Sequence, residues 1–438
     1  MAIGPELFVA GAFAAGYAYW RFSFRQLRDA ARLERTGHLD DARTLLNEFL
    51  INRNPLTSRA GSKARCRLQL ARLERNAGYY DAAIGEAQTL IDGNPSPGLV
   101  IAGIQVQADV LSWTGDLEGA LQRVEKARAL AESSREVSFL DELDGLKVRI
   151  WIWQGELSRA RALAESLVDK GGPSAFHAHL RMAELERVAG NFEASVEWCK
   201  KLLDLVGSDP SAKAPNPGAA GQAAPPALWA TLARYHAARS SWLAGDITRA
   251  REWMDSPDEV PALPRSDAVG WTGLRAVLED KAGDASAARR SAREFYEASA
   301  RAPGGYGARA WEPYYRARIA AHRERWKEAA AGVAAAMRNY PPGDAIAEMF
   351  YFLGLYQQEA GDPAAPEAFA SGARQPATLH FARLCREKGQ RQENGSRIQS
   401  SDVDAFEPGT PRANGHEKGE DVKRAGPVIA RKPRSSRQ

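Results

Sequence analysis

The hexapeptide Gly115-Asp-Leu-Glu-Gly-Ala120 decides the fold of this chain, because variants of it return along most of the sequence. The copies share a glycine, an apolar residue two positions later and a small residue five positions later. The clear copies are Gly37–Ala42, Gly78–Ala83, Gly115–Ala120, Gly155–Ala160, Gly190–Ser195, Gly245–Ala250 and Gly283–Ala288, and two degenerate ones are Arg325–Ala330 and Gly361–Pro366. Self-similarity at a fixed period predicts stacked repeat units instead of one globular core.

Each part of the hexapeptide has a physical reason. Glycine ends a helix at low cost because it adopts a positive φ readily. The small residue at the fifth position lets two helices approach closely. A second small residue lies seven positions before the glycine in most copies, while Val148 and Arg318 break this rule. These upstream small residues are Ala30, Ala71, Ala108, Ala183, Ala238, Ala276 and Gly354. The pattern therefore covers both helices of a hairpin.

This pattern resembles the tetratricopeptide repeat family over residues 27–376. The resemblance implies an all-α fold, an α-solenoid of eight or nine helical hairpins, in which the ninth could be a cap. Neighbouring copies are mostly further apart than the family period of about 34 residues, which indicates longer turns between hairpins. A non-repetitive helical bundle is the alternative fold.

Composition and charge fit a folded repeat body with a basic end. The 438 residues are 44% hydrophobic and 26% charged, as in ordinary soluble domains. The three cysteines lie far apart and predict neither a disulfide framework nor a metal site. Residues 423–438 carry six basic side chains and no acid, and they account for the formal charge of +4.

The N-terminal segment predicts a membrane anchor. Leu7–Trp20 carries no charge, and arginines follow at positions 21, 25 and 28. We interpret residues 1–22 as one transmembrane helix that contacts the membrane through residues 1–20. The positive-inside rule then places the repeats in the cytoplasm. A cleaved signal peptide, which normally begins with basic residues, and a buried or interfacial helix are the alternatives.

Two further segments lack helical periodicity. Residues 207–226 are rich in proline, glycine and alanine, and we expect an irregular insertion there. Residues 388–438 are polar, contain prolines and end in the basic cluster, which predicts a disordered tail. The tail is either solvated or in contact with an anionic surface. Lipid fits better than nucleic acid, because the anchor already places the chain at a membrane.

The sequence offers no chemistry typical of an enzyme. The seven histidines are scattered, and no phosphate-binding loop, nucleophile elbow or pair of CxxC motifs is present. We therefore predict a non-enzymatic protein without a cofactor and without a metal site.

The resemblance also implies a concave groove lined by the first helices of the hairpins. Its groove-facing positions are six and three residues before the turn glycine, and one turn earlier. These positions select Arg72, Arg75, Arg149, Arg187, Tyr235, Arg239, Trp242 and Tyr315 as partner-binding residues. Asp109, Glu184, Gln105 and His322 share the same positions. Arginines and aromatic residues are typical of binding hot spots, and such arginines could bind an acidic peptide or be neutralised by Asp109 and Glu184.

An N-terminal anchor followed by cytoplasmic repeats is similar in architecture to the lipopolysaccharide assembly protein B family, although this chain lacks that family's C-terminal cysteine pairs. We therefore predict a membrane-tethered adaptor that recruits protein or peptide partners. The alternative is an exported or periplasmic repeat protein with a structural role at the envelope. Nucleic acid is disfavoured as a partner, and homo-oligomerisation stays open.

Overall fold

The computed structural model describes residues 25–35, 38–51, 60–208, 226–255, 265–300, 307–339 and 345–393. These residues form 19 α-helices, the short 3-10 helix η1 (Val137–Phe139) and the π-helical turn η3 (Gly307–Trp311). The predicted anchor lies outside the described residues. Within them, no helix is both long and apolar enough to cross a membrane.

The helices pair into nine consecutive hairpins, each with its hexapeptide at the turn. The first five pairs are α2 (Arg25–Arg35) with α3 (Leu39–Ile51), α4 (Ala60–Ala77) with α5 (Tyr80–Asp92), α6 (Pro97–Trp113) with α7 (Leu117–Ser134), α8 (Leu140–Gln154) with α9 (Leu157–Lys170), and α10 (Pro173–Ala189) with α11 (Phe192–Ser208). The remaining pairs are α12 (Pro226–Leu243) with α13 (Ile247–Met254), α14 (Arg265–Ala282) with α15 (Ala285–Ala300), α16 (Glu312–His322) with α17 (Trp326–Arg338), and α18 (Ile346–Glu359) with α19 (Ala365–Ala373). A last helix, α20 (His380–Glu393), follows the ninth hairpin.

The turn glycines that the structure describes adopt the left-handed conformation that the hexapeptide predicts. Gly115 has φ 89° and Gly245 has φ 98°, and the aspartate that follows each caps the second helix through its side chain. The small residues of the pattern pack between the two helices, and Ala71, Ala108 and Ala120 are completely buried. Close helix pairing thus rests on the residues that define the repeat.

The eighth copy needs a correction of one residue. Its left-handed turn residue is Glu324, with φ 56°, and Arg325 is the N-cap residue of α17. The small residue seven positions before Glu324 is Ala317, which is 1% exposed, so the departure at Arg318 disappears. The copy lacks its glycine, and without it the sequence pattern alone placed the turn one position too late.

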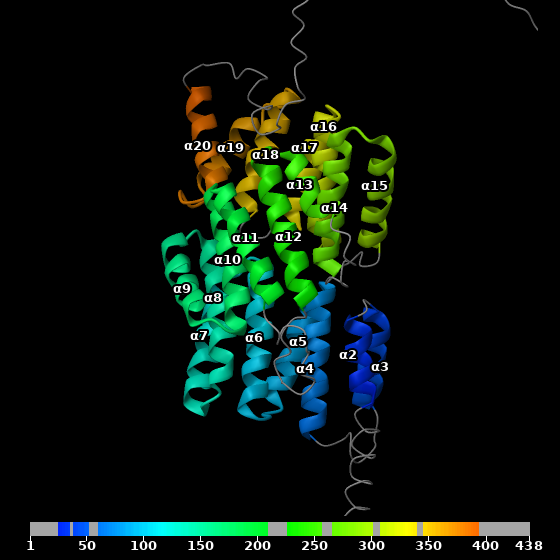
Figure 1. Ribbon diagram of the computed structural model, residues 1–438, viewed down its shortest axis with the longest axis vertical. Helices are drawn as coiled ribbons and strands as arrows, with labels where there is room; N and C mark the ends of the chain where they lie inside the picture. The colour runs from blue at the N-terminus through cyan, green and yellow to red at the C-terminus, as the bar shows by residue number, and fades with distance from the viewer. Residues whose placement is uncertain are drawn as a thin grey trace, which may run out of the picture.

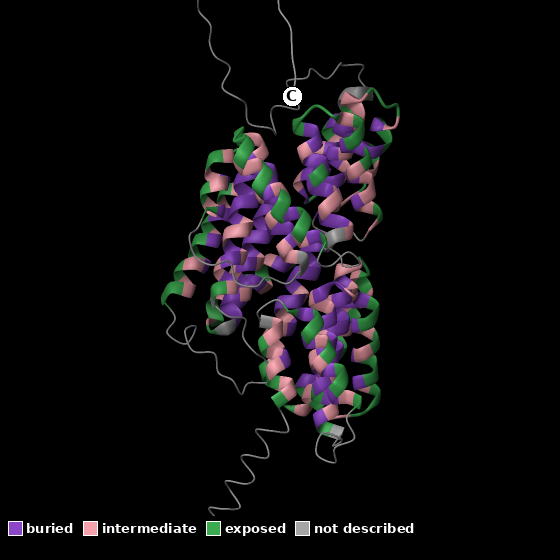
Figure 2. Cartoon of the chain, turned by 90° about the vertical axis from the view of Figure 1, so that its right-hand side faces the viewer, coloured by how far each residue is buried: buried purple, intermediate pink, exposed green. Residues whose placement is uncertain are grey.

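The hairpins wind into a tight superhelix. The α4 helix of the second hairpin contacts α14 of the seventh, and α10 of the fifth contacts α20, which follows the ninth. Hairpins five positions apart therefore stack on one another, as the lower and upper layers of Figure 1 show. Figure 2 shows the buried residues concentrated where helices of the stack face each other.

Two predicted segment boundaries can be compared with the helices. Helix α11 ends at Ser208 and α12 begins at Pro226, so most of the predicted insertion lies outside the described residues. The predicted tail begins too early, because α20 continues past residue 388 to Glu393. Cys385 and Lys388 on this helix are 0% and 6% exposed, and this packed face explains why the helix persists in a polar segment.

Candidate functional site

The arginines at the predicted groove-facing positions form a series along the solenoid. With the corrected eighth turn, the position six residues before it belongs to Arg318, so Arg72, Arg149, Arg239 and Arg318 occupy equivalent positions in the second, fourth, sixth and eighth hairpins. Arg72 is partly exposed, whereas Arg149, Arg239 and Arg318 are 7%, 3% and 1% exposed. The series therefore becomes more buried toward the C-terminal hairpins.

Arg149 shows how the interior neutralises such a cation. It forms an ion pair with Asp109 of the third hairpin and donates to the Ser112 hydroxyl at 2.6 Å. Its guanidinium carbon also lies 5.2 Å from the ring centre of Trp113 and 4.9 Å from that of Trp153. Stacking on aromatic faces and pairing with a carboxylate together offset the cost of burying the charge.

Asp109 is the carboxylate shared by two arginines. Arg75 contacts its second oxygen at 2.8 Å. Burial acts to raise the pKa of Asp109, but the positive charges of Arg149 and Arg75 outweigh it and lower that pKa. Asp109 therefore stays ionised and holds the second, third and fourth hairpins together.

The C-terminal arginines are neutralised in the same manner. Arg239 of the sixth hairpin contacts Glu348 of the ninth at 2.9 Å. Tyr314 also donates to Glu348. Arg318 donates to the Tyr356 hydroxyl at 2.7 Å, and its guanidinium carbon lies 4.7 Å from the centre of the Trp242 ring. The contacts of Arg239 with Glu348 and of Arg318 with Trp242 join hairpins that are not neighbours in the sequence.

Most of the predicted partner-binding residues thus lie inside the molecule. Besides Arg149 and Arg239, the side chains of Arg187, Trp242 and Tyr315 are buried. Tyr235 is partly buried, and its hydroxyl lies 3.0 Å from that of Tyr315. The structure brings Tyr235, Trp242 and Tyr315 together, and contact with a partner stays a prediction.

Arg72 and Arg75 lie on α4 of the second hairpin, and they are the predicted arginines that remain partly exposed. Arg75 is committed to Asp109, whereas none of the described carboxylates lies within ion-pair distance of Arg72. Burial and the charge of Arg75 lower the pKa of Arg72 from its usual value of 12.5. Arg72 is therefore the groove arginine best placed to accept an outside carboxylate.

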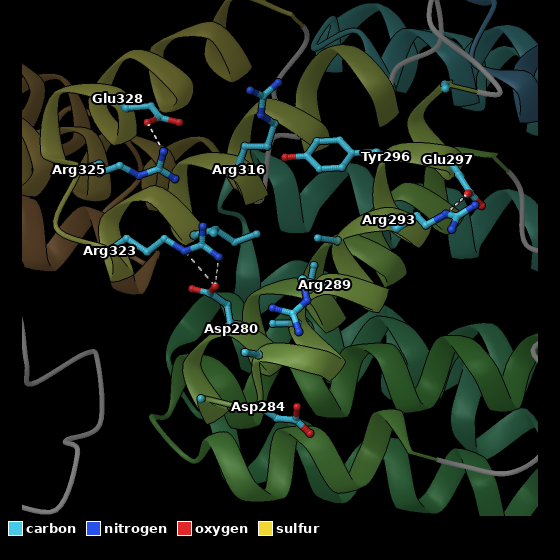
Figure 3. A pocket seen from close by; sticks show the side chains of 17 residues that line it. Asp280, Asp284, Arg289, Arg293, Tyr296, Glu297, Arg316, Arg323, Arg325 and Glu328 are labelled. Atoms are coloured by element: carbon cyan, nitrogen blue, oxygen red, sulfur yellow. Dashed lines mark hydrogen bonds and ion pairs between the residues drawn. The ribbon is translucent and has the colours of Figure 1, made fainter. Parts of the chain in front are cut away.

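A separate recess opens between α14, α15, α16 and the start of α17. Its volume is about 1040 Å³, and Ala276, Ala288, Ala292 and Ile319 supply apolar lining. Five arginines and four carboxylates also line it, and Figure 3 shows how they lie. These charged residues are Arg289, Arg293, Arg316, Arg323, Arg325, Asp280, Asp284, Glu297 and Glu328.

The sequence reasoning missed this recess. Its signal is present in α15, where Ala285, Ala288 and Ala292 recur at helical spacing beside Arg289 and Arg293. The small residues of such a helix are expected to be buried against the next hairpin. The spacing of the hexapeptides does not indicate that those of α15 are left accessible.

The described residues hold no cluster of histidine, cysteine and carboxylate side chains that could bind a metal ion. All three cysteines are buried and free, and burial raises the pKa of each thiol to about 12. A thiol with so high a pKa is protonated at neutral pH and is a poor nucleophile.

Nine hairpins with small residues at the helix contacts, left-handed turns and a superhelical stack settle the fold. The chain is a solenoid of tetratricopeptide-like hairpins. A tetratricopeptide repeat protein from Parabacteroides merdae is similar to 76% of this chain over 98% of its own, with 14% identity and a TM-score of 0.36. Yeast Tom70 is similar to 87% of this chain over 98% of its own, with 12% identity and a TM-score of 0.24.

At these TM-scores neither structure carries an argument about function. No family model and no curated protein sequence matches the chain.

Proposed function

We propose that this solenoid is a non-catalytic scaffold that recruits protein partners at a membrane surface. The observation that carries the proposal is the stack of nine hairpins, because such arrays present extended surfaces that suit protein recognition. In this proposal the first helix of each hairpin lines an inner wall, and Arg72 and Arg75 of α4, which are partly exposed, face it near the N-terminal end. An acidic segment of a partner would meet Arg72 there.

The membrane tether is part of the same proposal and rests on the sequence of residues 1–22. Fusion of a reporter that is active only in the cytoplasm, placed after Arg25, tests it. Activity would support a cytoplasmic scaffold behind a single anchor. Absence of activity would favour the alternative, an exported repeat protein with a structural role at the cell envelope.

Partner recruitment is tested by crosslinking the full chain in cells and identifying the attached proteins. A parallel bait carries Arg72→Glu, and a control bait carries Arg290→Glu, which reverses an exposed arginine on α15 that does not line the recess. We expect a protein that is captured by the natural chain and the control but lost from Arg72→Glu. If the natural chain captures no protein, the scaffold proposal is wrong.

A further inference from the structure

Helix α15 lacks a contact that the equivalent helices make. In the other hairpins of the stack, the second helix packs on the first helix of the next hairpin, as α13 does on α14 and α17 on α18. Helix α15 packs closely on α14 but hardly touches α16. The recess of about 1040 Å³ occupies the space that this missing contact leaves.

The burial of the small residue at the fifth position of the hexapeptide differs in α15 in the same way. The equivalent small residue, five positions after the left-handed turn residue, is completely buried in seven other hairpins, namely in Ala42, Ala83, Ala120, Ala160, Ser195, Ala250 and Ala329. Ala288 of α15 is only half-buried and lines the recess instead. Ala292 follows one turn later, so α15 offers a face of small residues that a further helix could approach closely.

An aromatic side chain stands at the edge of this face. Tyr296 lies two turns beyond Ala288 and is 48% exposed, one of three large hydrophobic side chains so exposed among the described residues. The guanidinium carbon of Arg316 lies 5.8 Å from its ring centre. Figure 3 shows the two side chains next to each other. An exposed aromatic residue beside an arginine is the composition of a binding hot spot.

The charges around the recess favour an acidic occupant. Three of its four carboxylates already have arginine partners: Arg323 binds Asp280, Arg293 binds Glu297 at 2.9 Å and Arg325 binds Glu328 at 2.9 Å. The fourth, Asp284, accepts from the backbone of Ser286 and Ala287 at the start of α15.

Two arginines remain for a partner. None of the described carboxylates pairs with Arg289, and Arg316 has only a half-exposed contact of 3.4 Å with Glu312. Exposed pairs of that kind contribute little stability, so a ligand carboxylate can bind Arg289 directly and can replace Glu312 at Arg316 at little cost.

We infer that an amphipathic helix of a partner protein docks between α15 and α16, with small or aliphatic residues on its buried face and aspartate or glutamate at its edges. This inference rests on the proposed scaffold function and names the partner class for one surface. The apolar segment Leu7–Trp20 of the chain itself fits less well, because it has no acid to offer Arg289 or Arg316.

The test uses a display library of helical peptides of about five turns, in which one face is fixed as alanine and leucine and the flanking positions vary among acidic, basic and neutral residues. The library is selected on the full-length chain. We expect the enriched peptides to carry more acidic than basic residues at the flanking positions.

Binding of an enriched peptide is then measured by fluorescence anisotropy. Ala292→Trp, which fills the recess, and Arg289→Glu combined with Arg316→Glu should each weaken binding by about tenfold or more. The control Arg290→Glu lies on the same helix outside the recess and should have little effect. A peptide whose acids are changed to lysine should regain affinity for the Arg289→Glu, Arg316→Glu variant. Circular dichroism checks that every variant is folded.

Enrichment of peptides without acids, or of peptides that bind the recess variants unchanged, would overturn the inference. So would sedimentation showing that the natural chain self-associates through this recess and that Ala292→Trp makes it monomeric, since the occupant would then be a second copy. Capture of partners through Arg72 does not involve the recess. The scaffold proposal can therefore survive the failure of this one.

Discussion

At the scale of single residues, the turn glycines fall into two groups with the same backbone and different surroundings. A Cβ added to Gly115 would meet nothing within 4 Å, whereas one added to Gly190 would come 2.5 Å from Nδ1 of His380 on α20. Both glycines have φ 89°. The pair therefore separates the strain of the turn from the contact between α20 and the fifth hairpin.

We expect Gly115→Ala to lower the free energy of unfolding by about 1–2 kcal/mol, the cost of a left-handed conformation for a residue with a side chain. Gly190→Ala should cost more, because His380 must also move. Urea unfolding of both variants measures the difference. Equal losses would show that the contact with His380 adds nothing to stability.

The pair of Arg149 and Asp109 leads to a second prediction. Arg149→Met should destabilise by about 3–5 kcal/mol, because it leaves a largely buried carboxylate with one arginine fewer. Adding Asp109→Leu removes that carboxylate and should restore part of the loss. Urea unfolding of the two single variants and the double variant gives the coupling between them, and strictly additive losses would contradict it.

The sequence predicted the burial of the repeat residues better than the burial of the residues expected to line the groove. Ala71, Ala108 and Ala120 are buried between helices as the pattern requires, since the contact lies within one hairpin. The burial of Arg149 and Arg239 depends on residues such as Glu348, which is 109 positions from Arg239 in the chain. A local pattern identifies which side of a helix faces inward but not how tightly the solenoid winds.

At the scale of elements, α20 closes the superhelix against earlier hairpins. Thr378, just before it, donates to the carbonyl of Gly155 at 2.6 Å, and Arg383 donates to that of Ala189 at 2.8 Å. The His380 ring packs edge-on against Phe192 of α11, with ring centres 5.4 Å apart. Burial of His380 and the charge of Arg383 lower its pKa from 6.5 to about 4.

This contact should weaken in acid. Between pH 6.5 and about 4 the unfolded chain binds a proton at His380 that the folded chain does not, so stability from this group is present above pH 6.5 and falls as the pH drops toward 4. His380→Gln should lose less stability than the natural chain between about pH 7.5 and pH 5. Melting temperatures at both values measure this.

His177 provides the control for that experiment, because burial also lowers its pKa to about 4. It lies near the start of α10, whereas α20 contacts the end of this helix, at Ala189 and Gly190. His177→Gln should remove its own share of the acid sensitivity and leave that of His380. An unchanged pH dependence in His380→Gln would mean that α20 does not hold the ring in its neutral form.

At the scale of the whole molecule, the five-hairpin stacking changes how the solenoid should unfold. In a simple repeat array each unit contacts only its neighbours, so segments can unfold separately. Here the contact of α4 with α14, the pair of Arg239 and Glu348, and the docking of α20 on α10 connect distant hairpins. Unfolding of one turn of the superhelix therefore removes the support of the other.

Removing the residues that follow Arg374 tests this coupling, because it deletes Thr378, His380 and Arg383 while leaving all nine hairpins. We expect a larger radius of gyration in X-ray scattering than for a reference chain that ends at Glu393, since the fourth and fifth hairpins lose their link to the ninth. Urea unfolding should also broaden and separate into more than one transition when circular dichroism and tryptophan fluorescence are compared. A truncated chain with an unchanged radius and one coincident transition would show that the remaining contacts between layers, such as that of α4 with α14, are sufficient to keep the superhelix closed.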